Sequence, residues 1–381
     1  MSYYMGIMSG TSLDGVDIVL ADIFPGNTKH PENFSFIAAQ SYPVPVRLKQ
    51  QLLALSQERH KNELDSYAHL DVQTGKLFAH CCQQLLKSQG VAAAKITAIG
   101  SHGQTLRHYP DTDYPTTLQI GDPNIIAQQC GITTIADFRR RDMASGGQGA
   151  PLVPPFHQAI FYSEKKNRVI LNIGGIANIT FLAAKGHLTT GYDTGPGNGL
   201  MDDWCLKHFN CPYDPDGQQA AKGQIHQYLL TQMLNDPYFS QAPPKSTGRE
   251  YFSYQWIFKQ LHNTGTEIDP SDVLRTLLEL SCISIRNEIN LLPEKIDEIL
   301  VCGGGTRNLY LMHRLQELLP GSLIASTENY GLHPDWVEAS AFAWLAYRTL
   351  NGLTGNLPSV TGADRKVILG AIWPVPHNPQ D

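Results

Sequence analysis

The chain has 381 residues, a net charge of −6, 17% charged residues and 42% hydrophobic residues. This length predicts one large or two medium domains, and the composition is typical of a globular protein rather than a disordered one. The sequence contains no basic block, which argues against a nucleic-acid partner, because such binding requires a positively charged surface.

Residues 3–22 contain two apolar stretches on either side of a small polar turn. The pattern predicts a β-hairpin whose turn, from Ser9 to Gly15, offers backbone N–H groups and hydroxyls to an anion. The turn is therefore a candidate phosphate-binding segment. An ordinary hairpin with a glycine-rich turn is the alternative.

Gly10 and Gly15 have the spacing of a P-loop, but the following residues depart from that motif. A P-loop continues with Lys and Ser or Thr, whereas Val16 and Asp17 stand here, and a strand follows in place of a helix. Without the lysine, the phosphate charge must be met by backbone amides and a metal ion. Asp14 and Asp17 suit Mg²⁺, directly or through water, because Mg²⁺ prefers oxygen ligands and keeps several waters.

The rest of the first half alternates helix-like and strand-like segments. Helices are expected at 45–58 and 65–89, and near 124. Strands are expected at 95–100 with its end at 101–104, around 118–123, and at 133–138 with its end at 139–142. The glycine-rich stretch 144–155 is typical of a loop and is the candidate domain boundary.

The second half begins as the first does. Residues 168–182 form a second apolar hairpin around Gly174 and Gly175, and helices follow it. This repetition predicts two related α/β domains that face each other across a cleft. The expected later elements are helices at 216–234, 250–262, 270–291 and 336–349, and a strand at 297–302.

Four segments share one design, an apolar strand that ends in glycine and polar residues. Ligand sites of α/β proteins assemble at such strand ends, and glycine lets a ligand approach the backbone closely. The segments are 6–17, 173–178, 192–198 and 301–308.

Asp193 follows a short apolar segment and precedes a stiff Gly-Pro-Gly turn at 195–197. That setting fixes a carboxylate at the mouth of a cleft. Phosphoryl transfer to a hydroxyl or water needs such a group to accept a proton or orient the nucleophile. An Asx turn or a helix N-cap is the alternative.

Residues 301–308 run from a strand through Gly303, Gly304 and Gly305 to a helix start. A flat adenine and ribose could lie on this bare backbone, with a plain tight turn as the alternative. Arg307 and Asn308 replace the later positions of G-x-G-x-x-G, which disfavours a Rossmann dehydrogenase.

Three further features carry weaker signals. The segment 243–250 has cations and hydroxyls that could reach a nucleotide, and 137–139 could bind a sugar or close the cleft. Glu338 falls in the first turn of its expected helix, where a carboxylate is favourable in any case.

The seven cysteines form no C-x-x-C pair, so we expect reduced and mostly buried thiols in a cytoplasmic protein. The run from His80 to Cys82 suggests a metal, but adjacent helical residues point apart, which favours a structural role. The first basic residue is Lys29 and no apolar run approaches the roughly 18 residues of a membrane span, so we expect neither a secretory signal nor a membrane helix. The cysteines are Cys81, Cys82, Cys130, Cys205, Cys211, Cys282 and Cys302.

With these segments in order, the chain resembles the anhydro-N-acetylmuramic acid kinase family, part of the actin, sugar-kinase and heat-shock ATPase superfamily. The resemblance runs nearly end to end. It rests on GIMSGTSLDGVD (6–17), GSHGQT (100–105), QIGDPNIIA (119–127), ADFRRRDMASGGQGAPLVP (136–154), LNIGGIANIT (171–180), DTGPGNGLMD (193–202), PKSTGRE (244–250), CGGGTRN (302–308) and EASAFAWLA (338–346).

The resemblance implies an α/β fold of two related actin-like ATPase (ribonuclease H-like) domains that flank a nucleotide cleft. Residues 1–137 with 336–381 would form the first domain, and 138–335 the second. The implied ATP-binding residues are Gly10, Thr11, Ser12, Leu13, Asp14, Gly15, Val16, Asp17, Gly174, Gly175, Gly303, Gly304, Gly305 and Asn308.

The implied reaction couples ring opening to phosphorylation. Water attacks C1 of 1,6-anhydro-N-acetylmuramate, with Asp193 as its base, while O6 takes the γ-phosphate of ATP. The product is N-acetylmuramate 6-phosphate, an intermediate of cell-wall recycling and amino sugar catabolism. The resemblance also implies Mg²⁺, a homodimer, and substrate contacts from Gln104, Asp122, Arg139 and Glu338.

Two alternatives remain open from the sequence. The first keeps the fold and makes the chain a plain hydroxyl kinase of another sugar. The second is a nucleotide-gated regulatory or binding protein, which would need an appended domain or polymer contact, and only a short tail follows Leu369.

Overall fold

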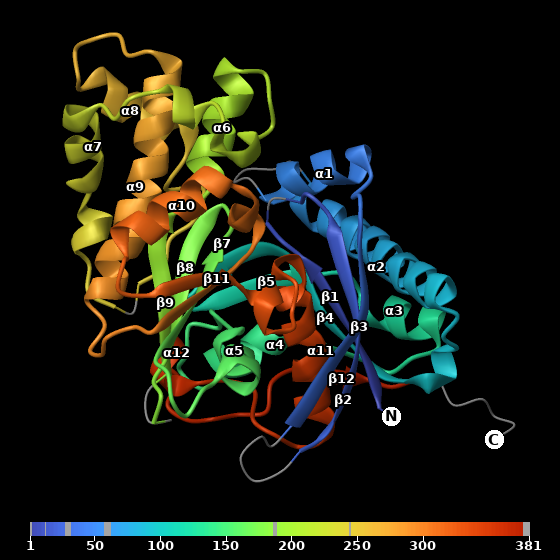
Figure 1. The fold of residues 1–381 in the computed structure, drawn as a ribbon. Coiled ribbons are helices and arrows are strands. Elements are labelled where there is room, and N and C mark those ends of the chain that lie inside the picture. The colour runs from blue at the N-terminus through green and yellow to red at the C-terminus, as the bar shows by residue number, and fades with distance from the viewer. Residues whose placement is uncertain are drawn as a thin grey trace, which may run out of the picture. The chain divides into compact units, whose positions relative to one another are not determined.

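The computed structural model describes residues 2–11, 13–26, 32–56, 62–185, 189–243 and 245–375. Contacts divide the chain into two compact units, residues 1–160 with 336–381, and residues 161–335. Each unit contains one β-sheet with helices packed on it (Figure 1).

The first unit is built on a seven-stranded sheet in the order β12-β6-β4-β1-β2-β3, with β5 paired to β4. Its strands are β1 (Tyr3–Ser9), β2 (Val16–Pro25), β3 (Glu32–Tyr42), β4 (Ile96–Tyr109), β5 (Thr116–Ile120), β6 (Thr134–Ala136) and β12 (Ala371–Trp373). Its helices are α1 (Val46–Ser56), α2 (Glu63–Gln89), α3 (Pro123–Cys130), α4 (Phe138–Met143), α11 (Val337–Leu350) and α12 (Pro358–Thr361), and α5 (Pro154–Phe161) ends at the unit boundary.

The second unit is built on a five-stranded sheet in the order β11-β10-β7-β8-β9. Its strands are β7 (Arg168–Ile173), β8 (Ile176–Leu182), β9 (Thr189–Pro196), β10 (Glu298–Cys302) and β11 (Leu323–Ser326). Its helices are α6 (Gly199–His208), α7 (Gln227–Leu234), α8 (Tyr254–His262), α9 (Pro270–Asn290) and α10 (Leu309–Leu318).

The two sheets repeat one topology. In each, three consecutive strands form an antiparallel meander, and a later strand joins the first strand in parallel, with another parallel strand beyond it. Thus β7, β8, β9, β10 and β11 correspond to β1, β2, β3, β4 and β6. This strand order is ribonuclease H-like, and its occurrence in both units agrees with the predicted duplication of an actin-like ATPase domain.

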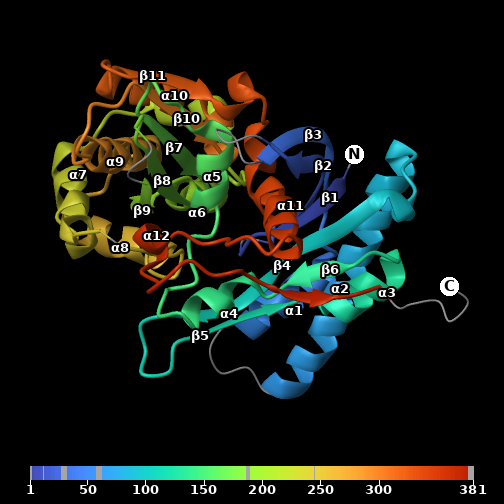
Figure 2. The ribbon, with the colours of Figure 1, turned by 90° about the horizontal axis from the view of Figure 1, so that it is seen from below.

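Helix α11 lies directly on the backbone of β1 and β4 (Figure 2). A Cβ atom added to Gly6 would lie 1.9 Å from the Ala339 carbonyl oxygen, and one added to Gly100 would lie 2.0 Å from the Phe342 carbonyl oxygen. Any larger side chain at either strand position would push the helix away. The small residues of α11 and these two glycines therefore set how closely the C-terminal part of the chain packs on the first sheet.

Each unit has its own apolar core. In the first unit, side chains of α2 such as Phe78 pack with strand residues such as Ile7 and Ile18, all at most 1% exposed. In the second unit, α9 is buried along most of its length, and Leu274 and Leu277 lie in the cluster under β7 and β8. Burial of each such side chain contributes about 1.5–3 kcal/mol to stability.

Several expected element ends differ from the observed ones. The strand expected at 95–100 continues through the polar residues to Tyr109, because β1 and β5 pair with it on both sides. The helix expected at 216–234 is two short 3₁₀ turns followed by α7, since Asp216 inside the first turn has a φ of +55° and Gly217 at its end has a φ of +73°. Phe138 and Arg139 begin α4 and do not end a strand.

The division between the units lies between Ile160 and Phe161, later than the 137/138 division that the resemblance implies and shortly after the glycine-rich stretch 144–155. Residues 138–160 belong to the first unit, and hydrogen bonds join them to its C-terminal segment. The buried Asp142 carboxylate accepts hydrogen bonds from the Gly149 N–H, the Asn356 amide and the Thr361 hydroxyl at 2.7–2.8 Å. The second division falls between Asp335 and Trp336.

Within the described residues, no helix has both the length and the apolar character needed to cross a membrane.

Candidate functional site

The first candidate segment is the turn between β1 and β2. The hairpin is formed as predicted, with Met8 opposite Asp17 in the antiparallel register. Leu13 has a φ of +55°, its side chain is buried, and its N–H donates to the Gly10 carbonyl at 3.1 Å. A buried leucine thus anchors the turn, while Thr11 at its start is exposed. Ser12 lies outside the described residues.

Gln104 holds this turn from the neighbouring strand. Its side-chain oxygen accepts a hydrogen bond from the Ser9 hydroxyl at 2.7 Å, and its amide nitrogen donates to the Gly10 carbonyl at 3.3 Å. The Ser9 hydroxyl is also 3.4 Å from the Gly15 carbonyl. Gln104 is buried, and its side-chain amide is hydrogen-bonded to the backbone of the candidate phosphate-binding turn.

Two carboxylates lie at the end of the turn, Asp14 within it and Asp17 just after it. The Asp14 side chain is 79% exposed and forms an ion pair with Lys49 at 3.2 Å, whereas Asp17 is half-buried on β2. Among the described residues, no group of three or more acidic, His or Cys side chains could enclose a metal ion by itself. Two carboxylates beside a candidate phosphate-binding turn nevertheless fit Mg²⁺, which usually takes one or two protein carboxylates together with phosphates and water.

A second cluster of the first unit surrounds Arg139. The Arg139 guanidinium donates to His102 Nε2 from Nε at 3.1 Å and lies 2.8 Å from it through Nη2, and Nη1 donates to the Gly149 carbonyl. Burial lowers the pKa of Arg139 to about 10, and the nearby carboxylates of Glu338 and Asp142 oppose this shift. Arg139 therefore stays charged at neutral pH, and the structure brings two predicted substrate residues, Arg139 and Glu338, into electrostatic contact.

The remaining predicted substrate residue, Asp122, caps a helix. Its Oδ1 accepts hydrogen bonds from the Asn124 N–H and side-chain amide at 2.8 and 2.9 Å at the start of α3. Its backbone lies against Gly75 of α2. This carboxylate has a structural role, so a substrate contact would have to use its other oxygen.

In the second unit, three glycine segments meet at one end of the sheet. The carbonyl of Gly174 accepts from the Asn198 N–H at 2.8 Å, and the carbonyl of Gly175 accepts from the N–H groups of Gly197 and Gly199 at 3.0 Å. A Cβ on Gly197 would lie 2.4 Å from the Gly174 oxygen, so only glycine permits this contact.

The third glycine segment joins the same place. Gly303 has a φ of +80°, and a Cβ there would lie 2.4 Å from Asn172 Oδ1 at the end of β7. Gly304 is open, because a Cβ added to it would have Asn198 Nδ2 as its nearest neighbour, at 3.9 Å. The bare backbone predicted from the sequence is therefore present at the carboxyl end of β10. The Asn308 side chain accepts from the Leu311 N–H at 3.0 Å and caps α10.

Asp193 lies on β9, one of the two edge strands of this sheet as described. The register with β8 shifts beside it, because Asn178 pairs with Asp193 and Ala177 pairs with Gly195, which leaves Thr194 as an extra residue. Such bulges turn side chains out of the regular alternation and are common beside active sites. Burial raises the pKa of Asp193 to about 6, with Glu250 adding to the rise and the Thr247 N–H opposing it. A half-buried carboxylate with this pKa can accept a proton near neutral pH.

Comparison with known proteins identifies the chain. The family model described as anhydro-N-acetylmuramic acid kinase matches residues 2–375. The chain belongs to the anhydro-N-acetylmuramic acid kinase family.

Curated members of this family are close in sequence. The anhydro-N-acetylmuramic acid kinases of the Dugway and Nine Mile strains of Coxiella burnetii are each 48% identical to the chain over 371 residues, covering 97% of both sequences. This membership confirms the predicted family and the predicted activity, a kinase that transfers phosphate to an alcohol group. It also confirms the predictions of ATP binding and of a place in peptidoglycan recycling and amino sugar metabolism.

Solved structures show more distant similarity. Component A of (R)-2-hydroxyglutaryl-CoA dehydratase from Acidaminococcus fermentans is 12% identical, with a TM-score of 0.47, and covers 92% of this chain and all (100%) of that one. The activator of 2-hydroxyisocaproyl-CoA dehydratase from Clostridium difficile, with bound ADPNP, is 13% identical, with a TM-score of 0.44 and coverages of 92% and 96%.

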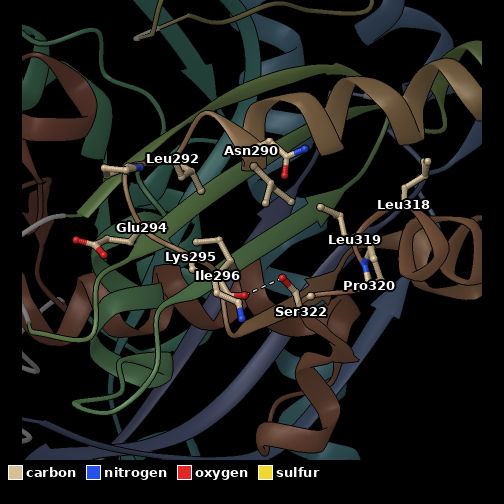
Figure 3. Close-up of a pocket in the computed structure, with 12 residues that line it drawn as sticks. Asn290, Leu292, Glu294, Lys295, Ile296, Leu318, Leu319, Pro320 and Ser322 are labelled. Carbon is tan, nitrogen blue, oxygen red and sulfur yellow. Dashed lines mark hydrogen bonds between the residues drawn. The ribbon is translucent and has the colours of Figure 1, made fainter.

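A hollow in this family member lies away from the glycine segments. It has a volume of about 370 Å³ and is lined by residues 289–290, 292–296 and 318–322, where the Ser322 hydroxyl donates to the Ile296 carbonyl at 2.8 Å (Figure 3). These residues precede β10 and β11, whereas Gly303–Gly305 follow β10. The hollow is therefore at the opposite end of strand β10 from Gly303.

Sequence reasoning missed several polar residues around Asp193. The Thr247 N–H donates to Asp193 Oδ2 at 3.0 Å, and the Tyr238 hydroxyl donates to the Asp193 carbonyl at 2.7 Å. Thr247 lies in the segment 243–250, which the sequence singled out only as a possible nucleotide contact. No feature of the sequence marks Tyr238 as a site residue, because only the tertiary structure places it beside β9.

Proposed function

We propose that this chain uses ATP to open the 1,6-anhydro ring of 1,6-anhydro-N-acetylmuramate hydrolytically and to phosphorylate O6. The products are N-acetylmuramate 6-phosphate and ADP. The observation that carries the proposal is Asp193, a carboxylate with a pKa of about 6 on a bulged edge strand beside three glycine segments.

In this reaction Asp193 accepts a proton from water as the water oxygen bonds to C1. The C1–O6 bond breaks, O6 bonds to the γ-phosphorus, and the bond between that phosphorus and the β-phosphate oxygen breaks to release ADP. Asp193 is suited to this role because its pKa lies near the pH at which it must work. The nearby Glu250 adds to the proton affinity of the carboxylate.

The other predicted residues support binding. The turn from Gly10 to Asp17 would hold the β- and γ-phosphates, and the open backbone at Gly304 would lie against the adenosine. Arg139 would carry a fixed positive charge to the sugar carboxylate, because His102 and the Gly149 carbonyl hold its guanidinium. Such a charge-assisted contact with a carboxylate is directional and strong.

Magnesium would be held by Asp17, with Asp14 as a second carboxylate. When bound, it would neutralise phosphate charge, a task for which this turn has no P-loop lysine.

We also propose that the protein works in the cytoplasm as a homodimer. The described cysteines are all free thiols, and six of the seven are buried, which suits a reducing compartment. The dimer rests on the family relationship. Light scattering of the purified protein at micromolar concentration tests it, and a monomer mass would refute it.

The decisive experiment is incubation with ATP, Mg²⁺ and 1,6-anhydro-N-acetylmuramate in H₂¹⁸O. The proposal predicts a sugar 6-phosphate with ¹⁸O at C1, and ADP in equal amount. Product formed from an ordinary sugar hydroxyl, without label at C1, would indicate a plain kinase. ATP turnover that ignores sugars and requires a protein partner would indicate a nucleotide-gated binding protein.

A further inference from the structure

A buried ion pair lies behind Asp193 and has no part in the chemistry described above. Lys245 Nζ is 2.7 Å from Glu288 Oε1, and the two side chains are only 1% and 4% exposed. Glu288 belongs to the last turns of α9. Because desolvation of two charges costs about as much as their attraction returns, such a pair adds little stability over apolar residues. A role in fixing geometry is then the better explanation.

The Lys245 backbone connects this pair to Asp193. Among the described residues β9 is an edge strand with no partner strand on its outer side, and the Asp193 N–H donates to the Lys245 carbonyl at 3.1 Å. Two residues later, the Thr247 N–H donates to Asp193 Oδ2 at 3.0 Å. The position of Lys245 therefore sets both a backbone contact and a side-chain contact of Asp193.

Tyr238 contacts both Asp193 and Lys245. Its hydroxyl donates to the Asp193 carbonyl at 2.7 Å, and the Lys245 ammonium lies 5.0 Å from its ring centroid. The ammonium is thus held by both a carboxylate and an aromatic ring. We define Tyr238, Lys245 and Glu288 as the support cluster of Asp193.

We propose that the support cluster positions the Asp193 carboxylate for proton abstraction, by fixing residues 245–247 so that the Thr247 N–H stays bonded to Oδ2. The inference rests on the proposed role of Asp193 as the base. Without the cluster, the segment would shift, the N–H would withdraw, and the carboxylate would lose both its orientation and a bond that favours its charged form. These are positioning residues, because they act through Asp193.

The groups that face Asp193 predict the direction of the effect. Glu250 raises the pKa of Asp193, the Thr247 N–H lowers it, and Lys245 and Glu288 balance each other in charge. Loss of the Thr247 bond therefore moves the titration of Asp193 upward.

The main test is the double variant Lys245→Met/Glu288→Gln, which leaves neither charge buried. Its matched control is Arg168→Met/Glu298→Gln, which removes a 2.7 Å ion pair from the first residues of β7 and β10. Both are compared with the wild type by ¹³C-carboxyl NMR of Asp193, assigned with Asp193→Asn, and by steady-state kinetics.

In the double variant we expect the Asp193 titration to move up by about half a pH unit or more. We expect kcat to fall about tenfold, with KM for ATP within about twofold of wild type. In the control we expect both readouts to match the wild type. A double variant with the wild-type titration and kcat would overturn the inference.

Tyr238→Phe provides a second test if the double variant does not fold. It removes one oxygen atom and the hydrogen bond to the Asp193 carbonyl, and leaves the ring beside Lys245. We expect a smaller shift of the titration in the same direction, and an unchanged titration would refute the role of the cluster. Lack of sugar phosphorylation by the wild type would refute the proposed function instead, because the NMR titration does not depend on turnover.

Discussion

The Arg139 guanidinium donates to Nε2 of His102, which must therefore be the unprotonated nitrogen of a neutral imidazole. Burial and the adjacent positive charge both hold the pKa of His102 well below its usual range, which agrees with this assignment. The ring also packs against Phe342 of α11 at 4.8 Å between centroids. His102 therefore orients the Arg139 guanidinium in the first unit and itself stays uncharged.

Replacement of His102 should weaken sugar binding selectively. His102→Phe keeps an aromatic ring against Phe342 but removes the acceptor, so the guanidinium loses its orientation and is left with unmet donors. An unmet buried donor costs about 1–3 kcal/mol, which corresponds to a rise in KM for the sugar of about 5- to 150-fold. Steady-state kinetics with each substrate varied measures it. KM for ATP should stay within about twofold, and an equal rise in both constants would contradict this role.

The pH dependence of turnover should follow Asp193. Because the carboxylate must be ionised to take a proton, kcat should fall about tenfold per pH unit below a midpoint near 6. Asp193→Asn should lose about 10²- to 10⁴-fold in kcat, which is the usual contribution of a general base, and still bind ATP in calorimetry. A midpoint near the ordinary aspartate value of 3.8, or near-normal turnover by Asp193→Asn, would exclude Asp193 as the base.

The same carboxylate should reduce stability at neutral pH. Its pKa is raised in the folded state, so between about pH 4 and 6 the native protein holds a proton that the unfolded chain has lost, and stability falls as pH rises. Asp193→Asn removes this loss of stability, and the pKa shift of Asp193 limits the gain in free energy of unfolding to about 3 kcal/mol.

Urea unfolding of the wild type and Asp193→Asn at about pH 4 and about pH 7.5 measures this difference. The variant should gain stability over the wild type only at the higher pH. The exposed Asp113→Asn is the control and should change stability by less than about 0.5 kcal/mol at either pH. Equal effects of Asp193→Asn at both pH values would refute the linkage.

Gly6→Ala should destabilise the first unit. The added methyl would meet the backbone of α11 at 1.9 Å, which no side-chain rotation relieves, so we expect a loss of about 3 kcal/mol or more. Gly321→Ala is the matched control, because no atom of the described part of the chain lies within 4 Å of its Cβ position. Thermal and urea unfolding compare the two variants, and similar stabilities would show that α11 can move off the strand at little cost.

Asp14 and Asp17 should differ in their effect on the need for magnesium. Asp14 is largely exposed and paired with Lys49, whereas Asp17 is half-buried on β2. We expect Asp17→Asn to raise the Mg²⁺ concentration for half-maximal activity by about tenfold or more, and Asp14→Asn by about twofold. Lys49→Met is the control for the loss of the ion pair alone. A larger effect of Asp14→Asn would reverse the assignment.

Local patterns in the sequence were enough to predict the two hairpins and their glycine turns. Apolar runs on both sides of Gly10–Gly15 and of Gly174–Gly175 predict strands, and the glycines between them favour a turn. Ordered motifs along the whole chain also predicted the family. Element ends were less predictable, as for β4, because hydrogen bonds from β1 and β5 extend it through polar residues.

The sequence by itself determined the hairpins, the glycine-rich strand ends, the family and Asp193 as the candidate base. The hairpins, the strand ends and the setting of Asp193 follow from residue types that are close together in the chain, and the family follows from the order of such motifs along it. Only the tertiary structure decided what surrounds these residues: Glu288 is 43 positions from Lys245, and His102 is 37 positions from Arg139. The proton affinity and orientation of Asp193 depend on burial and on such distant partners, and these arise only when the chain is folded.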